Sequence, residues 1–131
     1  MSRSLAILAL VASAALATSC GKPGQGALVP YSLDGGLPSA MLDPSPDAWE
    51  SAPWTGTDVR WLPYGPHVQL QVQHGLGRTP TGVLTYISFV ESGQNPSQAA
   101  GDLARLVEVT DDHVTVWNDT NGSYFARIVV F

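Results

Sequence analysis

Residues 67–74 alternate strictly between polar and apolar side chains, and this pattern restricts the fold more than any other. A β-strand points successive side chains to opposite faces, so the alternation predicts a half-buried strand with Val68, Leu70 and Val72 toward the core. The 131 residues also include 13 glycines and 10 prolines, and no long amphipathic helix is evident. Because glycine and proline interrupt helices, the chain is expected to be all-β.

Further strands are expected along the rest of the chain. Residues 83–90 are more apolar and suit a central strand, and residues 103–110 and 113–118 flank a turn built on two aspartates. Residues 124–131 are apolar enough to be covered on both faces. We predict a small antiparallel β-sandwich or flattened barrel of about six to seven strands.

The first twenty residues carry the pattern of an export signal. Arg3 supplies a positive charge, residues 5–17 form a run of 13 apolar or small residues, and small residues lead to Cys20, the only cysteine. A helix needs about 20 apolar residues to span a bilayer, so this run is too short. The segment resembles a bacterial lipoprotein signal with its lipobox, although Leu16 lies one place early. The resemblance implies that Cys20 becomes the lipidated first residue; the alternative is a secreted protein with a free thiol.

Charge and the residue after the cysteine indicate where such a protein would act. Gly21, not an acidic residue, follows Cys20, which in the lipoprotein family favours the outer membrane where two membranes are present. Loss of Arg3 with the signal would leave five basic and eleven acidic side chains. This balance argues against nucleic acid as a partner and against a polybasic membrane patch. We therefore expect an envelope protein that contacts the membrane through lipid on Cys20.

The sequence divides into three parts. Residues 1–19 are assigned to the signal peptide, 20–56 to a lipidated tether and proline-rich arm, and 57–131 to the β-sandwich domain. The arm is too apolar for a pure linker, so we expect it to be extended and to pack partly on the body, with docking to a partner as the alternative. Single helical turns are expected around residues 47–51 and, after an Asn-Pro pair, at 95–100.

A glycine-rich corner follows the alternating strand. His74 has the same parity as Leu70 and Val72, so it should point inward and hydrogen-bond turn backbone that would otherwise lack a partner. Gly75 and Gly77 permit positive φ angles, and Pro80 stiffens the exit. We interpret these four residues as a structural turn.

The same corner carries a second resemblance. The stretch from His74 to Pro80, with residues 114–120 and 125–130, resembles the receptor-binding tip domains of phage tail fibres, over roughly residues 66–131. The resemblance implies a β-sandwich that recognises surfaces and forms trimers. The chain departs from that family in its lipoprotein-like signal and in having no fibrous stalk.

The candidate binding site is built around Trp117. Assuming a hairpin that places Trp117 beside Tyr124, two aromatic rings would adjoin a loop containing Asn118, Asp119 and Asn121. Rings that stack on sugar C–H faces, beside amides and carboxylates that bind hydroxyls, suit a glycan. The alternative is a cross-strand aromatic pair that stabilises the hairpin or fills a subunit interface.

Metal and catalytic sites are not expected. His67 and His74 are separated by an odd number of positions and so face opposite sides of a strand. Asp111, Asp112 and His113 are too few for a closed zinc site, with a weak calcium site as the alternative. The sequence has no nucleophile elbow, zinc-binding helix motif or phosphate loop. We predict a protein without a cofactor that is not an enzyme.

These observations predict a lipid-anchored envelope module that binds a glycan or another surface polymer. The alternative is a non-catalytic structural or assembly subunit that uses the same rim and arm for protein contacts. A hydrolase with a hidden catalytic constellation is a third possibility. The oligomer implied by the tail-fibre resemblance is a homotrimer.

Overall fold

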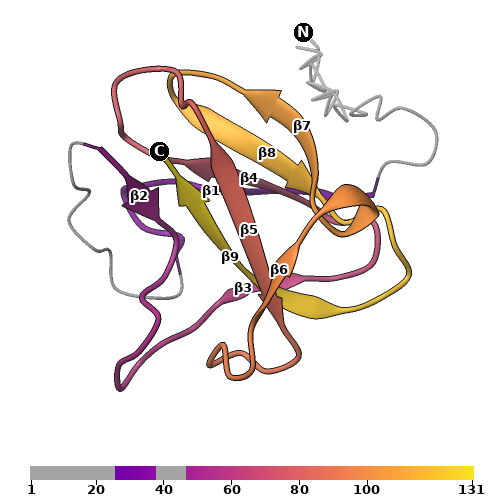
Figure 1. Cartoon of the computed structure of the whole chain (residues 1–131). Coiled ribbons are helices and arrows are strands. Elements are labelled where there is room, and N and C mark those ends of the chain that lie inside the picture. Colours follow the sequence, from indigo (N-terminus) through magenta and orange to yellow (C-terminus); the bar gives the residue numbers. More distant parts are fainter. Residues whose placement is uncertain (1–25, 38–46) are drawn as a thin grey trace, which may run out of the picture.

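A computed structural model describes residues 26–37 and 47–131 of the chain. Within these residues it contains nine strands and one short 3-10 helix, arranged as two sheets that do not close into a barrel (Figure 1). The prediction of a small all-β sandwich is confirmed. The elements are β1 (Leu28–Tyr31), β2 (Trp49–Glu50), β3 (Leu62–Tyr64), β4 (Gln69–Gln73), β5 (Val83–Ser88), β6 (Ser97–Ala99), η1 (Gly101–Leu103), β7 (Arg105–Val109), β8 (His113–Trp117) and β9 (Tyr124–Val130). None of the described helical residues forms a segment able to cross a membrane.

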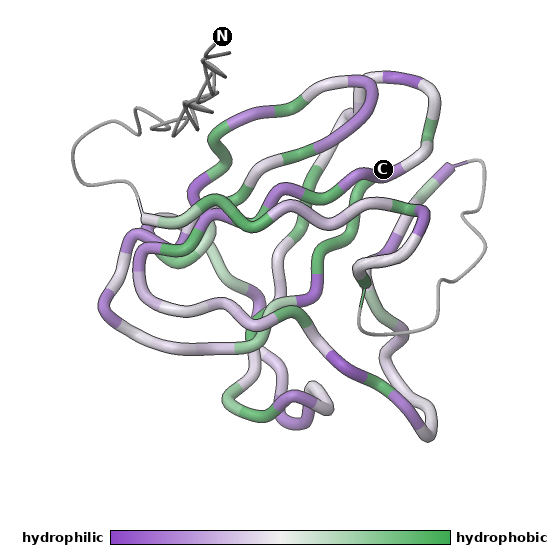
Figure 2. The backbone as a smooth tube through the Cα atoms, turned by 180° about the vertical axis from the view of Figure 1, so that it is seen from behind, coloured by the Kyte–Doolittle hydropathy of each residue, from purple (hydrophilic) through white to green (hydrophobic). Residues whose placement is uncertain are grey.

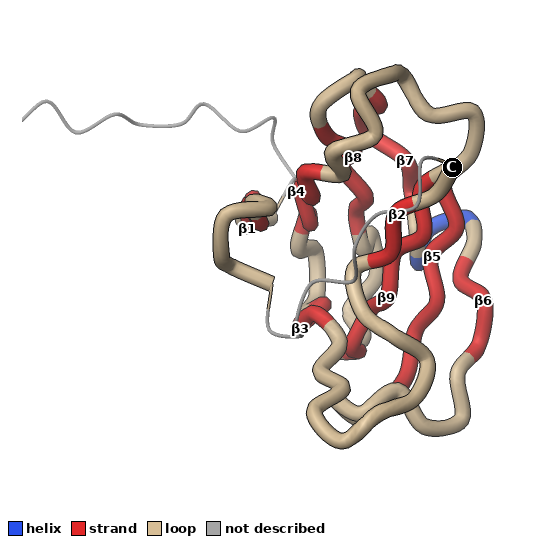
Figure 3. Tube along the Cα trace, turned by 90° about the vertical axis from the view of Figure 1, so that its left-hand side faces the viewer, coloured by secondary structure: helices blue, strands red, loops and turns tan. Residues whose placement is uncertain are grey.

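The two sheets form separate layers (Figure 3). The four-stranded sheet has the order β1-β4-β8-β7, and the five-stranded sheet has the order β2-β9-β5-β6 with β3 also paired to β9. Every pairing is antiparallel except that of β1 with β4. β9 is therefore paired along both edges, and the consecutive residues Ala126, Arg127 and Ile128 are fully buried, so its middle is also covered on both faces.

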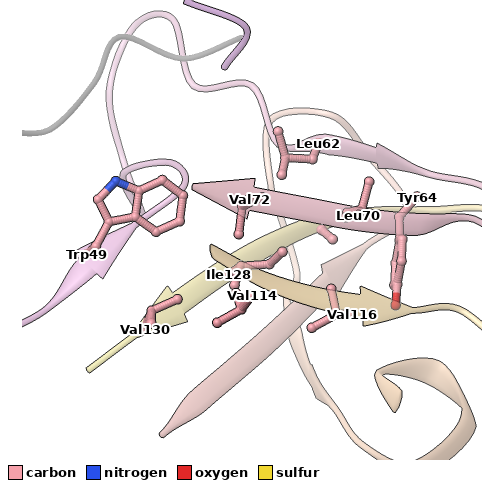
Figure 4. Close-up of a cluster of buried hydrophobic side chains, with 10 residues drawn as sticks. Trp49, Leu62, Tyr64, Leu70, Val72, Val114, Val116, Ile128 and Val130 are labelled. Carbon is pink, nitrogen blue, oxygen red and sulfur yellow. The ribbon is translucent and has the colours of Figure 1, made fainter. Parts of the chain in front are cut away.

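The core lies between the layers (Figure 4). Hydrophobic and hydrophilic stretches follow one another along the backbone (Figure 2), and the apolar side chains of β4 and β8 lie in the core. The fully or almost fully buried members are Trp49, Leu62, Tyr64, Leu70, Val72, Val114, Val116, Ala126, Ile128 and Val130. Each large aliphatic side chain buried in this way contributes about 1.5–3 kcal/mol. The inward set predicted for β4 is confirmed at Leu70 and Val72, and Val68 is partly buried against the same core.

The described parts of the arm belong to the sandwich. Residues 28–31 pair with β4, and Trp49 on β2 is buried opposite Val130. The helical turn expected at residues 47–51 is wrong, because an extended backbone is what places Trp49 in the core and Glu50 on the outer face. The part of the arm at residues 38–46 lies outside the described residues.

The second helical turn is also misplaced. Ser97–Ala99 forms strand β6, which pairs with β5 and buries Ala99 opposite Thr85. Asn95 adopts a positive φ of 50° instead of the cap conformation, and the helical turn comes later, at Gly101–Leu103. Pairing with a neighbouring strand outweighed the local capping signal here.

Candidate functional site

His74 and its glycines form the structural corner that the sequence predicts. His74 is fully buried; its Nδ1 accepts from the Leu76 backbone N–H at 3.2 Å, which leaves Nε2 to donate to the Thr110 carbonyl at 3.1 Å. Gly75 and Gly77 have φ angles of 63° and 68°. The imidazole thus ties the strand exit to the β7–β8 turn, and Pro80 lies on the way to β5.

The predicted Trp117–Tyr124 pair does not form. Trp117 lies on β8 in one sheet, opposite Gln69 and Arg105, whereas Tyr124 lies on β9 in the other sheet, opposite Tyr64. Trp117 is only 9 % exposed, with the Arg105 guanidinium 5.1 Å from its ring centre. Because the chain crosses between sheets after Trp117 instead of turning back, the aromatic rim that the hairpin would have made is absent.

The loop residues assigned to that rim are engaged within the fold. Asn118 is fully buried; its amide nitrogen lies 2.8–3.3 Å from the carbonyls of Tyr64, Gly65 and Gly122, and its Oδ1 accepts from the Thr120 N–H and hydroxyl. Asp119 and Asn121 also contact side chains from other parts of the fold. Asp119 forms an ion pair with Arg105 of β7 at 3.0 Å, and Asn121 forms a hydrogen bond with His67 at 3.0 Å.

A different feature is open to a ligand: a groove of about 390 Å³ on the outer face of the four-stranded sheet. Along β8, Val114 and Val116 face the core while His113 faces the groove. The 31–36 turn forms its other wall. The lining residues are Pro30, Tyr31, Ser32, Gly35, Gly36, Gln71, Gln73, Asp112 and His113.

The two groove glutamines differ in how they are held. Gln73 accepts from the Leu33 backbone N–H at 3.1 Å and donates to Asp112 at 2.9 Å, so both ends of its amide are fixed. Gln71 has no side-chain partner among the described residues. Directly opposite it, Thr115 is 3 % exposed, and its hydroxyl also lacks a partner within the described ranges. The middle of the groove therefore offers the Gln71 amide, whereas the Thr115 hydroxyl is buried beside it and does not line the groove.

His113 lies between two carboxylates at the end of the groove. Its Nε2 is 2.9 Å from Glu108 and its Nδ1 is 3.3 Å from Asp112. The hydrogen bond with Glu108 raises the pKa of His113 above 6.5; burial opposes this with a smaller effect, and the hydrogen bond with Asp112 raises the pKa further. Hydrogen bonds from Gln73 and His113 lower the pKa of the Asp112 carboxyl below 3.8. At pH values between the lowered pKa of Asp112 and the raised pKa of His113, the carboxyl group is deprotonated and the imidazole is protonated.

Stability should respond to pH through His113. Because its folded-state pKa is raised, the stabilisation is complete below about pH 6.5 and is lost as the pH rises through the higher folded value. Urea unfolding at pH 6 and pH 8.5 should show the lower free energy of unfolding at pH 8.5, with His113→Gln flattening the difference. An unchanged pH response in that variant would contradict the assignment to His113.

Metal binding finds no geometric support in the residues that the structure describes. No group of three or more His, Cys, Asp or Glu side chains there is arranged to hold an ion. The carboxylates of Glu108 and Asp112 point to His113 instead.

Sequence reasoning missed the groove because its two walls are distant in the chain. The alternation placed Gln71 and Gln73 on the water-facing side, which is where they lie. No sequence signal showed that β1 would pair with β4, or that the 31–36 turn would then border the outer face of β4 and form one side of the groove.

Comparison of the chain with protein-family models, with curated proteins and with solved structures found no match. Function is therefore inferred from the groove and from the pattern of the first twenty residues.

Proposed function

We propose that this protein is a lipid-anchored envelope protein whose β-sandwich binds a neutral glycan in the groove between the 31–36 turn and β8. The anchor is carried by the signal-like sequence that ends at Cys20, which lies outside the described residues. Two or more acyl chains hold a protein stably on a bilayer. Mass spectrometry of the mature N-terminus tests this part: the mass of a lipid on Cys20 supports it, and an unmodified Cys20 rejects it.

The observation that carries the binding proposal is the amide of Gln71, which has no side-chain partner in residues 26–37 and 47–131 and lies between polar neighbours that are held in place. Gln73 and His113 are already held by hydrogen bonds, so a ligand would not have to order them. Gln71 can both donate to and accept from hydroxyl groups. The volume of about 390 Å³ lies in the range of small-molecule sites.

Charge favours a neutral sugar over an acidic one. The Asp112 carboxylate lines the groove and Glu108 lies directly behind His113. A carboxylate accepts hydrogen bonds from sugar hydroxyls but repels a uronic or sialic acid. Tyr31 also lines the groove, and its partly buried side chain packs against the core.

Gln71→Ala should weaken glycan binding about tenfold, because one or two hydrogen bonds of about 1 kcal/mol each are lost. Isothermal calorimetry with a panel of neutral oligosaccharides, including N-acetylglucosamine tetramer and cellobiose, measures the change. Gln98→Ala is the matched control, since Gln98 is an exposed glutamine on β6 of the other sheet.

Two results would contradict the proposal. Binding of no oligosaccharide by the wild-type protein would reject a glycan ligand. Equal affinity of wild type and Gln71→Ala would move any binding away from this groove.

An assembly subunit of the envelope is the second candidate. Phe89 is 80 % exposed, and its ring centre lies 5.5 Å from that of Tyr124 at a tilt of 52°, which leaves an apolar surface on the loop after β5. Exposed aromatic side chains of this kind are enriched in protein interfaces. A partner protein that co-purifies with wild type but not with Phe89→Ser would favour this function.

A further inference from the structure

Strand β7 is an open and partly apolar edge. It is the last strand of its sheet, and among the described strands it pairs only with β8. Leu106 is 49 % exposed and Val107 is 42 % exposed on it. Exposed sheet edges offer unpaired backbone groups to other strands, and proteins protect them with charged side chains, proline, β-bulges or a covering segment. No proline or lysine occurs in Arg105–Val109.

A bulge in β7 determines how its charges are placed. The register with β8 shifts between Leu106 and Glu108, so Val107 is the extra residue. As a result Arg105 lies opposite Trp117 and Glu108 opposite Thr115, both on the outer face of the sheet. Without the bulge, residues three apart would face opposite sides.

This arrangement is complementary to itself. We propose that β7 pairs antiparallel with β7 of a second copy of this chain, about a two-fold axis between Leu106 and Val107. Arg105 of each copy then lies opposite Glu108 of the other, and Leu106 lies opposite Val107. The same patch serves both subunits, as a two-fold interface requires, and opposite charges directly across a strand pair are favourable.

Arg105 and Glu108 each retain side-chain atoms that can form hydrogen bonds with a second copy of the chain. Arg105 contacts Asp102 and Asp119 through Nη2 alone, at 2.7 and 3.0 Å, which leaves Nε and Nη1 to donate. Glu108 uses Oε2 for His113, so its other oxygen is available. Existing partners therefore orient both side chains without using them fully.

Apolar surface beside the strand adds to the interface. A cleft of about 240 Å³ opens between the two sheets next to Leu106. Val83, Ala99, Ala104 and Val116 contribute to its lining. Pairing through β7 would cover Leu106 and Val107 and join two four-stranded sheets into one continuous sheet, with both grooves on the same face.

Sedimentation equilibrium of the full chain carrying Cys20→Ser, which can form neither a lipid thioether nor a disulfide, tests the proposal. We expect twice the chain mass at high concentration. Leu106→Glu should raise the dissociation constant by at least about tenfold, because a charge would be buried at the axis. Leu28→Glu is the matched control: Leu28 is 52 % exposed on β1, the opposite edge, and should leave the dimer intact.

A charge exchange tests the register independently of Leu106. Glu108→Arg and Arg105→Glu should each fail to self-associate, because like charges then face one another twice. An equimolar mixture should form a heterodimer, since every facing pair is again opposite in sign. A folded Cys20→Ser protein that remains monomeric at all concentrations, a trimer, or a dimer broken by Leu28→Glu and not by Leu106→Glu would overturn the proposal.

Discussion

Replacing Arg127 with alanine is expected to lower the free energy of unfolding by about 3 kcal/mol, the low end for breaking a buried ion pair. Arg127 is fully buried on the outer face of the five-stranded sheet, under the ring of Trp54 at 3.8 Å. Its guanidinium donates to the Ala52 carbonyl at 2.7 Å and to Glu50. Removing it leaves a carboxylate and a carbonyl without partners and removes the support of the exposed indole.

Urea denaturation monitored by tryptophan fluorescence measures this loss. Arg78→Ala is the control, because Arg78 is exposed and makes a single long contact of 3.4 Å to the Asp47 carbonyl. Equal stability of the Arg127→Ala and Arg78→Ala proteins would show that the Trp54–Arg127–Glu50 cluster does not hold the 51–60 loop on the sheet.

Replacing Asn118 with alanine should also cost about 3 kcal/mol, from several hydrogen bonds worth about 1 kcal/mol each. The Asn118 side chain binds three backbone carbonyls and accepts two hydrogen bonds from Thr120. These contacts join the end of β3 to the loop that carries the chain from one sheet to the other. Thermal unfolding of the variant measures the effect.

Asn121→Ala provides the comparison for Asn118. Asn121 is exposed and has one side-chain contact, to His67 at 3.0 Å, so its loss should change stability little. If Asn118→Ala kept wild-type stability and lost glycan binding, the role first predicted for this loop would replace the structural one.

The alternation of polar and apolar residues correctly predicted which face of a strand a side chain occupies, but it did not predict which strands pair with one another. The alternation through β4 correctly oriented Leu70 and Val72, and parity alone placed His74 inside the corner. Trp117 was expected to pair with Tyr124 in a hairpin, yet Tyr124 belongs to the other sheet. Side-chain direction follows from backbone geometry, whereas strand pairing depends on how distant segments cover one another.

The groove likewise depends on strand pairing that the sequence does not reveal. Gln71 could be placed on the outer surface from the sequence, but its neighbours across the groove come from β1 and the turn after it. Parallel pairing of β1 with β4 leaves no local turn signal, because the strands are joined by a long connection. The proline-rich composition of the arm argued for an extended segment without revealing that it completes a sheet.

The position of β9 has a consequence for how the chain is made. β9 is the last strand in the order, yet β2, β3 and β5 all pair with it. The five-stranded sheet therefore cannot assemble until residues 124–130 have been synthesised, and such non-local pairing is slow to form.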